Sequence, residues 1–183
     1  FPFDGMHNIY NALAAAGAAH AVGMESTEIA TALQSAIPPP QRGQVLNFKK
    51  GFTVINDSYN SNPAALISMV ETMLQGGEGR RKIVVAGEML ELGVDEAEIH
   101  RRTGQEIAGL GIDKLIGVRG LAEIMVEGAQ TEGLDAEFAK DSDAAADILL
   151  GQVREDDLIL VKGSRGVRTE RVVDRLLDRF ELA

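Results

Sequence analysis

The chain has 183 residues, of which 45% are hydrophobic and 25% are charged, and its formal net charge is −10 at pH 7. This composition predicts a globular protein with one sizeable core. The acidic surplus argues against a nucleic-acid partner, because binding a phosphate backbone requires Lys and Arg. The absence of cysteine excludes disulfides, thiolate catalysis and Cys-based zinc sites.

Other function classes are also disfavoured. The histidines His7, His20 and His100 are scattered along the chain, so we expect no protein-built transition-metal site. Apolar runs are too short to span a bilayer and no basic-then-apolar leader is present, so we expect a cytoplasmic protein, and a monomer. The helical pattern begins only a few residues after Phe1, so we expect this sequence to be a fragment of a longer chain.

The first elements are predicted to be helices. An Ala-rich helical pattern covers residues 6–21, and Ser26 is the expected N-cap of a second helix that ends near Ala36. Pro38-Pro39-Pro40 cannot continue a helix and favours an extended conformation. We therefore place a domain boundary there, with residues 1–38 in one domain and residues 39–183 in another.

Beyond the prolines, strands and helices alternate. Gln44 to Phe48 and Phe52 to Asn56 are predicted to form a hairpin in which Gly51 supplies the positive φ of the turn. The expected helices then cover residues 63–75, 95–110, 121–132, 142–153 and 166–180, and the expected strands cover residues 82–86, 114–118, 137–139 and 158–162. This alternation predicts a doubly wound α/β fold with a mostly parallel sheet.

Two of these strands are predicted to be central. Ile83-Val84-Val85-Ala86 and Leu158-Ile159-Leu160-Val161 are apolar throughout instead of alternating, which is typical of strands buried on both faces. Parallel strands bring their following loops to one edge of the sheet. Ligands collect at that edge, because helix N-termini offer free N–H groups there.

The run Asp57-Ser58-Tyr59-Asn60-Ser61-Asn62-Pro63 follows the second hairpin strand. It offers several hydrogen-bonding side chains and one flat ring, and Asn62 with Pro63 is a good N-cap and first-turn pair. It is either a ligand site or simply a well-capped turn, because Asn, Asp, Ser and Pro are ordinary turn residues.

Two later strand ends also carry polar residues. The loop from Gly87 to Gly93 contains Glu88 and Glu91, which can bind a cationic group or face water. It lacks the glycine spacing of a dinucleotide site. Lys162-Gly163-Ser164-Arg165-Gly166 can cradle a carboxylate or phosphate, or it is a solvated connection.

Residues of the first domain and the linker offer further candidates. Asn8 and Asn11 fall on one helix face, where they can recognise a purine edge or simply solvate the helix. Arg42 follows the triple proline and can reach a phosphate, although a lone linker arginine is usually just exposed.

Together these segments resemble the Mur ligases, ATP-dependent enzymes that form the amide bonds of the peptidoglycan peptide. The matching segments are residues 5–16, the Pro-rich linker with Arg42-Gly43, Asp57 to Pro63, Gly87 to Gly93, and Val161 to Arg165. Within the family, the runs at Asp57 and Lys162 are most similar to members that add D-alanyl-D-alanine to UDP-N-acetylmuramoyl-tripeptide. The resemblance implies the last helices of a central ATPase domain, followed by a C-terminal Rossmann-like domain.

The resemblance also implies roles for individual residues. ATP would contact Asn8, Arg42, Asp57, Tyr59 and Asn60, and the dipeptide would be bound by Lys162, Ser164, Glu88 and Arg165. Glu88 departs from the family pattern, which usually has Asp at this position. ATP and Mg²⁺ are the expected cofactors. The phosphate loop and metal ligands of the central domain have no counterpart in this sequence, so we expect the chain alone to be inactive.

Two other interpretations stay open at this point. In the first, the chain would be part of a related ligase on the same scaffold, of the folylpolyglutamate or cyanophycin type. A non-catalytic Rossmann-like module would bind a nucleotide or a protein without any chemistry.

Overall fold

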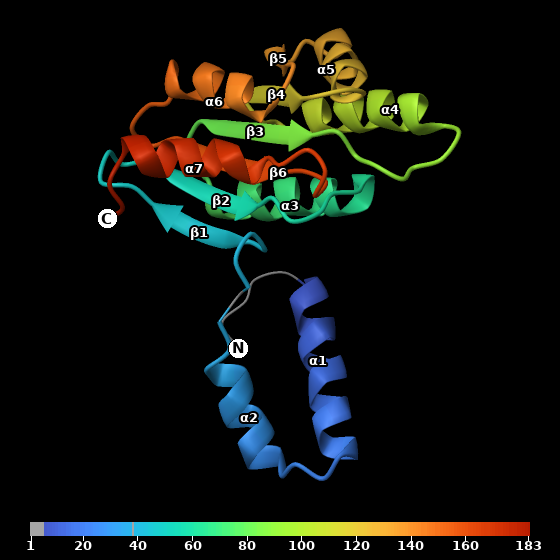
Figure 1. The fold of residues 1–183 in the computed structure, drawn as a ribbon, viewed down its shortest axis with the longest axis vertical. Coiled ribbons are helices and arrows are strands. Elements are labelled where there is room, and N and C mark those ends of the chain that lie inside the picture. The colour runs from blue at the N-terminus through green and yellow to red at the C-terminus, as the bar shows by residue number, and fades with distance from the viewer. Residues whose placement is uncertain (1–5, 38) are drawn as a thin grey trace. The chain divides into compact units, whose positions relative to one another are not determined.

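The computed structural model describes residues 6–37 and 39–183, and the chain divides into two units, Phe1–Pro39 and Pro40–Ala183. Helices α1 (Met6–Ala21) and α2 (Ser26–Gln34) make up the described part of the first unit (Figure 1). The predicted N-cap at Ser26 was wrong. Glu25 caps α2 instead, because its carboxylate and that of Glu28 form a reciprocal capping box with the backbone.

The second unit opens with a β-hairpin, β1 (Gln44–Asn47) and β2 (Thr53–Asp57). Its other elements are α3 (Pro63–Gly76), β3 (Lys82–Gly87), α4 (Glu96–Gly109), β4 (Lys114–Val118), α5 (Ala122–Thr131), β5 (Ala136–Ala139), α6 (Ser142–Leu150), β6 (Leu158–Lys162) and α7 (Glu170–Arg179). The strands form one sheet in the order β1-β2-β6-β3-β4-β5 (Figure 1). Only the β1–β2 pair is antiparallel, which confirms the predicted fold class.

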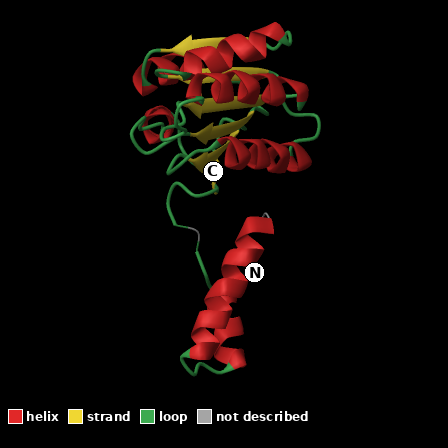
Figure 2. Cartoon of the chain, turned by 90° about the vertical axis from the view of Figure 1, so that its right-hand side faces the viewer, coloured by secondary structure: helices red, strands yellow, loops and turns green. Residues whose placement is uncertain are grey.

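Strands β6 and β3 lie at the centre of the sheet, as their apolar sequences predict. Along β3, Ile83 and Val85 enter the core that contains α6 and α7, whereas Val84 and Ala86 enter the core that contains α3, α4 and α5. Helices therefore cover both faces of the sheet (Figure 2). Alternate residues from Ile83 to Ala86 fill two separate cores, so none of these four positions is free to be polar.

Local signals fix the turns at both ends of β2. Gly51 has φ +91°, and its N–H donates to the Phe48 carbonyl at 2.8 Å, which confirms the predicted hairpin turn. Asn62 caps α3 by accepting a hydrogen bond from the Ala65 N–H at 2.8 Å.

Helix α7 begins at Glu170, not near Gly166 as predicted, because the chain first turns after β6 with Arg168 at φ +62°.

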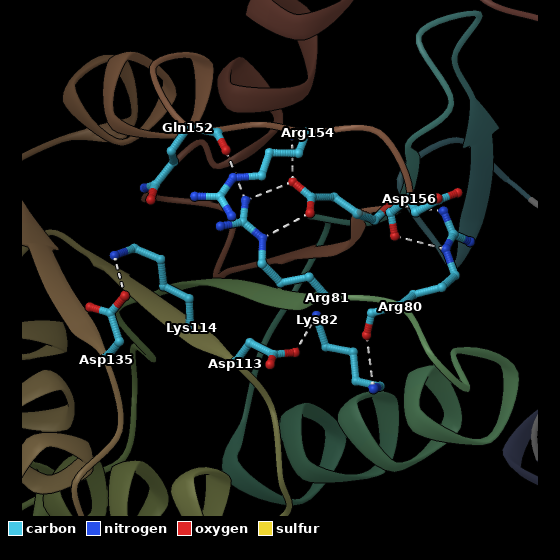
Figure 3. Close-up of polar contacts among 10 residues, drawn as sticks. Arg80, Arg81, Lys82, Asp113, Lys114, Asp135, Gln152, Arg154 and Asp156 are labelled. Carbon is cyan, nitrogen blue, oxygen red and sulfur yellow. Dashed lines mark hydrogen bonds and ion pairs between the residues drawn. The ribbon is translucent and has the colours of Figure 1, made fainter.

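Charged side chains are paired with one another where the parallel strands begin (Figure 3). Arg81 Nε and Nη2 donate to the two carboxylate oxygens of Asp157, both at 2.8 Å, and Asp157 also accepts from the Arg154 N–H. The hydrogen bond to Asp157 raises the pKa of Arg81, against the opposing effect of burial. This bidentate pair links the segments that precede β3 and β6.

A second cluster lies at the same edge, at the start of β4. The Lys114 ammonium is 2.9 Å from Asp135 and 2.5 Å from Glu137. Burial lowers the pKa of Lys114, but hydrogen bonds to Glu137 and Asp135 outweigh this effect and raise it. Arg81 and Lys114 are thus both engaged within the fold.

Helices α4 and α5 approach closely enough for their backbones to touch. A Cβ at Gly104 would lie 1.9 Å from the Met125 carbonyl oxygen, and a Cβ at Gly128 would lie 2.3 Å from the Arg101 carbonyl oxygen. Only glycine fits at either position. This contact fixes the helix that follows β3 against the helix that follows β4.

We expect Gly104→Ala to lower the free energy of unfolding by about 1–3 kcal/mol, because the added methyl group forces α4 and α5 apart. Urea denaturation measures the effect. Gly109→Ala is the matched control in the same helix, because a Cβ at Gly109 meets nothing within 4 Å. The control should be neutral or stabilising by up to about 1 kcal/mol, and equal stability of the two variants would contradict the packing argument.

Candidate functional site

The carboxyl ends of the parallel strands bring the predicted polar loops together. Lys162, the last residue of β6, pairs with Asp57 of β2 on one side and with Ala86 of β3 on the other. Gly87 at the end of β3 pairs in turn with Val118 at the end of β4. The loops that follow β2, β6, β3 and β4 therefore begin side by side along one edge of the sheet, which confirms the predicted convergence.

An ion pair between β2 and β6 organises the loop after β2. Lys162 Nζ donates to Asp57 Oδ2 at 2.5 Å and to the Asn60 carbonyl at 2.9 Å. The side chain of Lys162 is 4% exposed and that of Asp57 is 16% exposed. Because an unpaired buried charge is costly, this pair holds residues 57–60 against the end of β6.

The linker segment is attached to the same loop. Asp57 Oδ1 accepts a hydrogen bond from the Gly43 N–H at 3.0 Å. The Tyr59 N–H donates to the Gln41 carbonyl at 3.2 Å, and Gln41 adopts φ +63°. Both bonds place residues 41–43 alongside residues 57–59.

An exposed aromatic ring lies between segments that carry guanidinium groups. Tyr59 is 41% exposed, and the Arg42 and Arg165 guanidinium carbons lie 4.1 and 5.3 Å from its ring centroid. Arg165 Nη1 also donates to Gln41 Oε1 at 3.4 Å. The attraction between cation and ring face thus groups side chains from the linker, the β2 loop and the β6 loop.

The loop after β3 is tied to its neighbours by hydrogen bonds to its backbone. The Leu90 N–H donates to Ser164 Oγ at 3.0 Å, and the Met89 N–H donates to His100 Nε2 at 3.0 Å. His100 is fully buried and its Nδ1 lies 2.7 Å from the Glu96 carbonyl. The proton is therefore assigned to Nδ1, and neutral His100 bridges the loop to α4.

Glu88 and Arg119 connect the ends of β3 and β4. Glu88 Oε1 accepts from the Leu121 N–H at 2.9 Å, at the start of α5, where the helix dipole favours a carboxylate. Glu88 Oε2 lies 3.8 Å from Arg119 Nε, and Arg119 Nη1 donates to the Gly166 carbonyl at 2.6 Å. The Glu88 carboxylate is only 14% exposed, so its contact with substrate stays a prediction.

Glycines at this edge make room for a threonine. A Cβ at Gly87 would lie 2.9 Å from Thr169 Cγ2, and a Cβ at Gly163 would lie 2.6 Å from Thr169 Oγ1. Thr169 is fully buried, and its hydroxyl has no hydrogen-bond partner among the described residues. Close packing of α7 against the ends of β3 and β6 therefore explains both glycines.

One candidate belongs to the first unit, and some residues at this edge of the second unit were missed. Asn8 belongs to α1 in the first unit, and its contact with a nucleotide stays a prediction. Sequence reasoning missed His100 and Gln41, because no short motif shows which backbone groups they contact in the fold. Arg119 was also missed, although it directly follows the strand predicted at residues 114–118.

Two kinds of feature are absent from residues 6–37 and 39–183. No group of three or more His, Asp or Glu side chains is arranged there to hold a metal ion. None of the helices in this described part is long and apolar enough to cross a membrane.

Comparison with known proteins identifies relatives of this fold and sequence. The family described as "Mur ligase, glutamate ligase domain" matches residues 41–165. The chain is 31% identical to the UDP-N-acetylmuramoyl-tripeptide--D-alanyl-D-alanine ligase of Bacillus subtilis over 185 residues, covering 97% of the chain and 39% of that relative.

Solved structures give the same assignment. A crystal structure of MurF from Acinetobacter baumannii matches with a TM-score of 0.85 and 27% identity, over 97% of this chain and 39% of that one. MurF ligase from Thermotoga maritima in complex with ADP matches with a TM-score of 0.65 and 27% identity, over 79% of this chain and 33% of that one. The chain thus spans well under half the length of these relatives.

We expect Lys162→Met to lower the free energy of unfolding by about 3 kcal/mol, because Asp57 then keeps a largely buried charge without its partner. Lys49→Met is the matched control, since it breaks a 2.7 Å ion pair between side chains that are 63% and 80% exposed and should change stability little. Guanidinium denaturation of both variants provides the measurement. An equal loss in the two would show that the Lys162 pair is no more important than a surface contact.

Proposed function

The chain belongs to the Mur ligase family, and we propose that it is the C-terminal part of an ATP-dependent ligase that adds D-alanyl-D-alanine to UDP-N-acetylmuramoyl-tripeptide in peptidoglycan synthesis. The match to relatives that carry this activity in their names supports the proposal. The runs at Asp57 and Lys162, which resemble this branch of the family, lie on adjacent strand ends. Since ATP is the expected energy source, we also propose a cytoplasmic location.

The observation that carries the proposal is the group formed by Arg42, Tyr59 and Arg165 next to the Asp57–Lys162 ion pair. An exposed ring can stack on a nucleobase, and guanidinium groups suit phosphate oxygens. Each carboxylate oxygen of Asp57 has accepted one hydrogen bond and keeps a lone pair for a ribose hydroxyl. We therefore assign Arg42, Asp57, Tyr59 and Asn60 to ATP in this proposal, and Asn8 as a further contact.

The role of the chain in the reaction is to bind and orient. ATP supplies the phosphoryl group that activates the carboxylate of the muramoyl peptide, and the dipeptide amine then forms the amide. We propose that Ser164, Lys162, Glu88 and Arg165 line the dipeptide. Ser164 Oγ, which accepts from the Leu90 N–H, retains its own proton for donation. Lys162, which makes two hydrogen bonds, retains one N–H.

Mg²⁺ and the groups that stabilise the transferring phosphoryl are proposed to lie outside this chain. Phosphoryl transfer of this kind needs a metal ion and fixed cations to neutralise developing charge. The described residues offer no cluster of carboxylates and histidines for such an ion. The chain supplies one side of the nucleotide site in this proposal, and the other side comes from elsewhere in the full-length protein.

Phosphate release by the full-length protein tests the proposed activity. We expect ATP hydrolysis to require both UDP-N-acetylmuramoyl-tripeptide and D-alanyl-D-alanine, and the 183-residue chain alone to show no turnover. Folate with glutamate, and cyanophycin substrates, serve as the comparison panel. Turnover with one of these, but not with the dipeptide, would assign the protein to a different ligase class.

Substitution of Tyr59 tests the nucleotide face. We expect Tyr59→Leu in the full-length protein to raise the KM for ATP about fivefold or more, because stacking on an aromatic ring contributes about 1–3 kcal/mol per base. Tyr59→Phe keeps the ring and should retain the wild-type KM. If both variants bind ATP as the wild type does, the base does not stack on this side chain.

A further inference from the structure

Arg119 occupies a strained position at the carboxyl end of β4. Its φ is +68°, a region that side chains other than glycine rarely adopt. The backbone is held there because the Arg119 N–H donates to the Ala139 carbonyl at 2.8 Å, which extends the β4–β5 pairing by one residue. Backbone strain of this kind persists only where the surroundings enforce it, and it clusters at functional positions.

The Arg119 guanidinium is held in place by the fold, but most of its N–H donors have no hydrogen-bond partner among the described residues. Nη1 donates to the Gly166 carbonyl at 2.6 Å. The 3.8 Å between Nε and Glu88 Oε2 exceeds hydrogen-bond length, and Glu88 already accepts from the Leu121 N–H. The side chain is 48% exposed, and Nη2 has no hydrogen-bond partner in the part of the chain that the structure describes. A guanidinium has five N–H donors, so most of them are available to a ligand.

Three other cations of this edge already have partners. Lys162 is buried against Asp57 and the Asn60 carbonyl, while Arg42 and Arg165 lie over the Tyr59 ring. Arg119 follows β4, which is separated from β2 by β6 and β3. At the usual strand spacing this places the end of β4 about 14 Å along the edge from the end of β2, and the Arg119 side chain extends from there to Gly166. A second anionic group, apart from the nucleotide, would meet Arg119.

We propose that Arg119 binds the terminal carboxylate of the amine-bearing substrate, which is D-alanyl-D-alanine if the function proposed above holds. The planar guanidinium fork matches a carboxylate with two parallel hydrogen bonds. The Gly166 carbonyl constrains the fork because it accepts from Nη1, while Nη2 keeps its N–H donors for a ligand. The loop from Lys162 to Gly166 then joins the dipeptide carboxylate at one end to the Tyr59 face at the other.

The test removes first the carboxylate charge of the dipeptide and then the guanidinium charge of Arg119. The full-length protein is assayed with D-alanyl-D-alanine and with its C-terminal amide, using wild type and Arg119→Gln. For wild type, we expect the KM of the amide to exceed that of the acid by about 10- to 100-fold, the usual range for a hydrogen bond to a charged group. Arg119→Gln should raise the KM of the acid to about the wild-type KM of the amide, so that the variant discriminates poorly between the two. The KM for ATP should stay unchanged.

Further variants separate binding from folding. Arg101→Gln is the matched control, because Arg101 is a half-exposed arginine 3.6 Å from Glu127 on α5, and it should keep the wild-type discrimination. Arg119→Gly removes the guanidinium while relieving the positive φ, so it should reproduce the kinetic effect of Arg119→Gln without loss of thermal stability.

The outcomes distinguish this assignment from the proposed function. If wild type ligates the dipeptide but Arg119→Gln and Arg119→Gly still prefer the acid to the amide by the wild-type ratio, Arg119 is not the carboxylate ligand and the proposed function stands. If wild type does not ligate the dipeptide at all, the proposed function fails and the assignment of Arg119 fails with it.

Discussion

The ammonium of Lys162 is the group on which the candidate site depends. It lies at the carboxyl end of a central strand, almost entirely shielded from water, and its charge is balanced by Asp57 on the adjacent strand. The second hydrogen bond, to the Asn60 carbonyl, fixes the backbone of the loop that carries Tyr59. Gly43 is attached through the other oxygen of Asp57, so one buried pair aligns β2, β6 and the linker segment.

Cationic side chains have different partners at the two edges of the sheet. At the edge where the strands begin, Arg81 is bound bidentately to a buried carboxylate and Lys114 lies between two carboxylates. At the opposite edge, exposed guanidinium groups contact a ring or a single carbonyl instead. A protein with a net charge of −10 thus keeps unsaturated cationic donors at one edge, where they attract anionic ligands.

Close backbone contacts make this arrangement rigid. Thr169 fits between Gly87 and Gly163 at the ends of the central strands, and Gly104 lets α4 meet α5. His100 adds a buried hydrogen bond from α4 to the loop after β3. Because ligand contacts lose strength when donors are displaced by even a small distance, such packing supports a site that is built largely from loops.

The sequence by itself determined the order of the elements, the central place of β3 and β6, the cap at Asn62, the turn at Gly51 and the family. These depend on local propensity, on continuous apolar runs and on short motifs, which neighbouring residues encode together. It predicted less well the start of α7 and the cap of α2, where a turn at Arg168 and a capping box at Glu25 override the simpler signals.

Only the tertiary structure decided which polar side chains are paired within the protein and which keep hydrogen-bonding groups for a ligand. Lys162 and Glu88 are candidate ligand contacts in sequence and Arg119 is not, yet Lys162 is buried in an ion pair, Glu88 accepts from the N–H of Leu121 at the start of α5, and Arg119 keeps free donors. The reason is physical. Burial and hydrogen-bond satisfaction depend on partners that are 33 to 105 residues away along the chain, and strand order, which no local pattern encodes, brings those partners into contact.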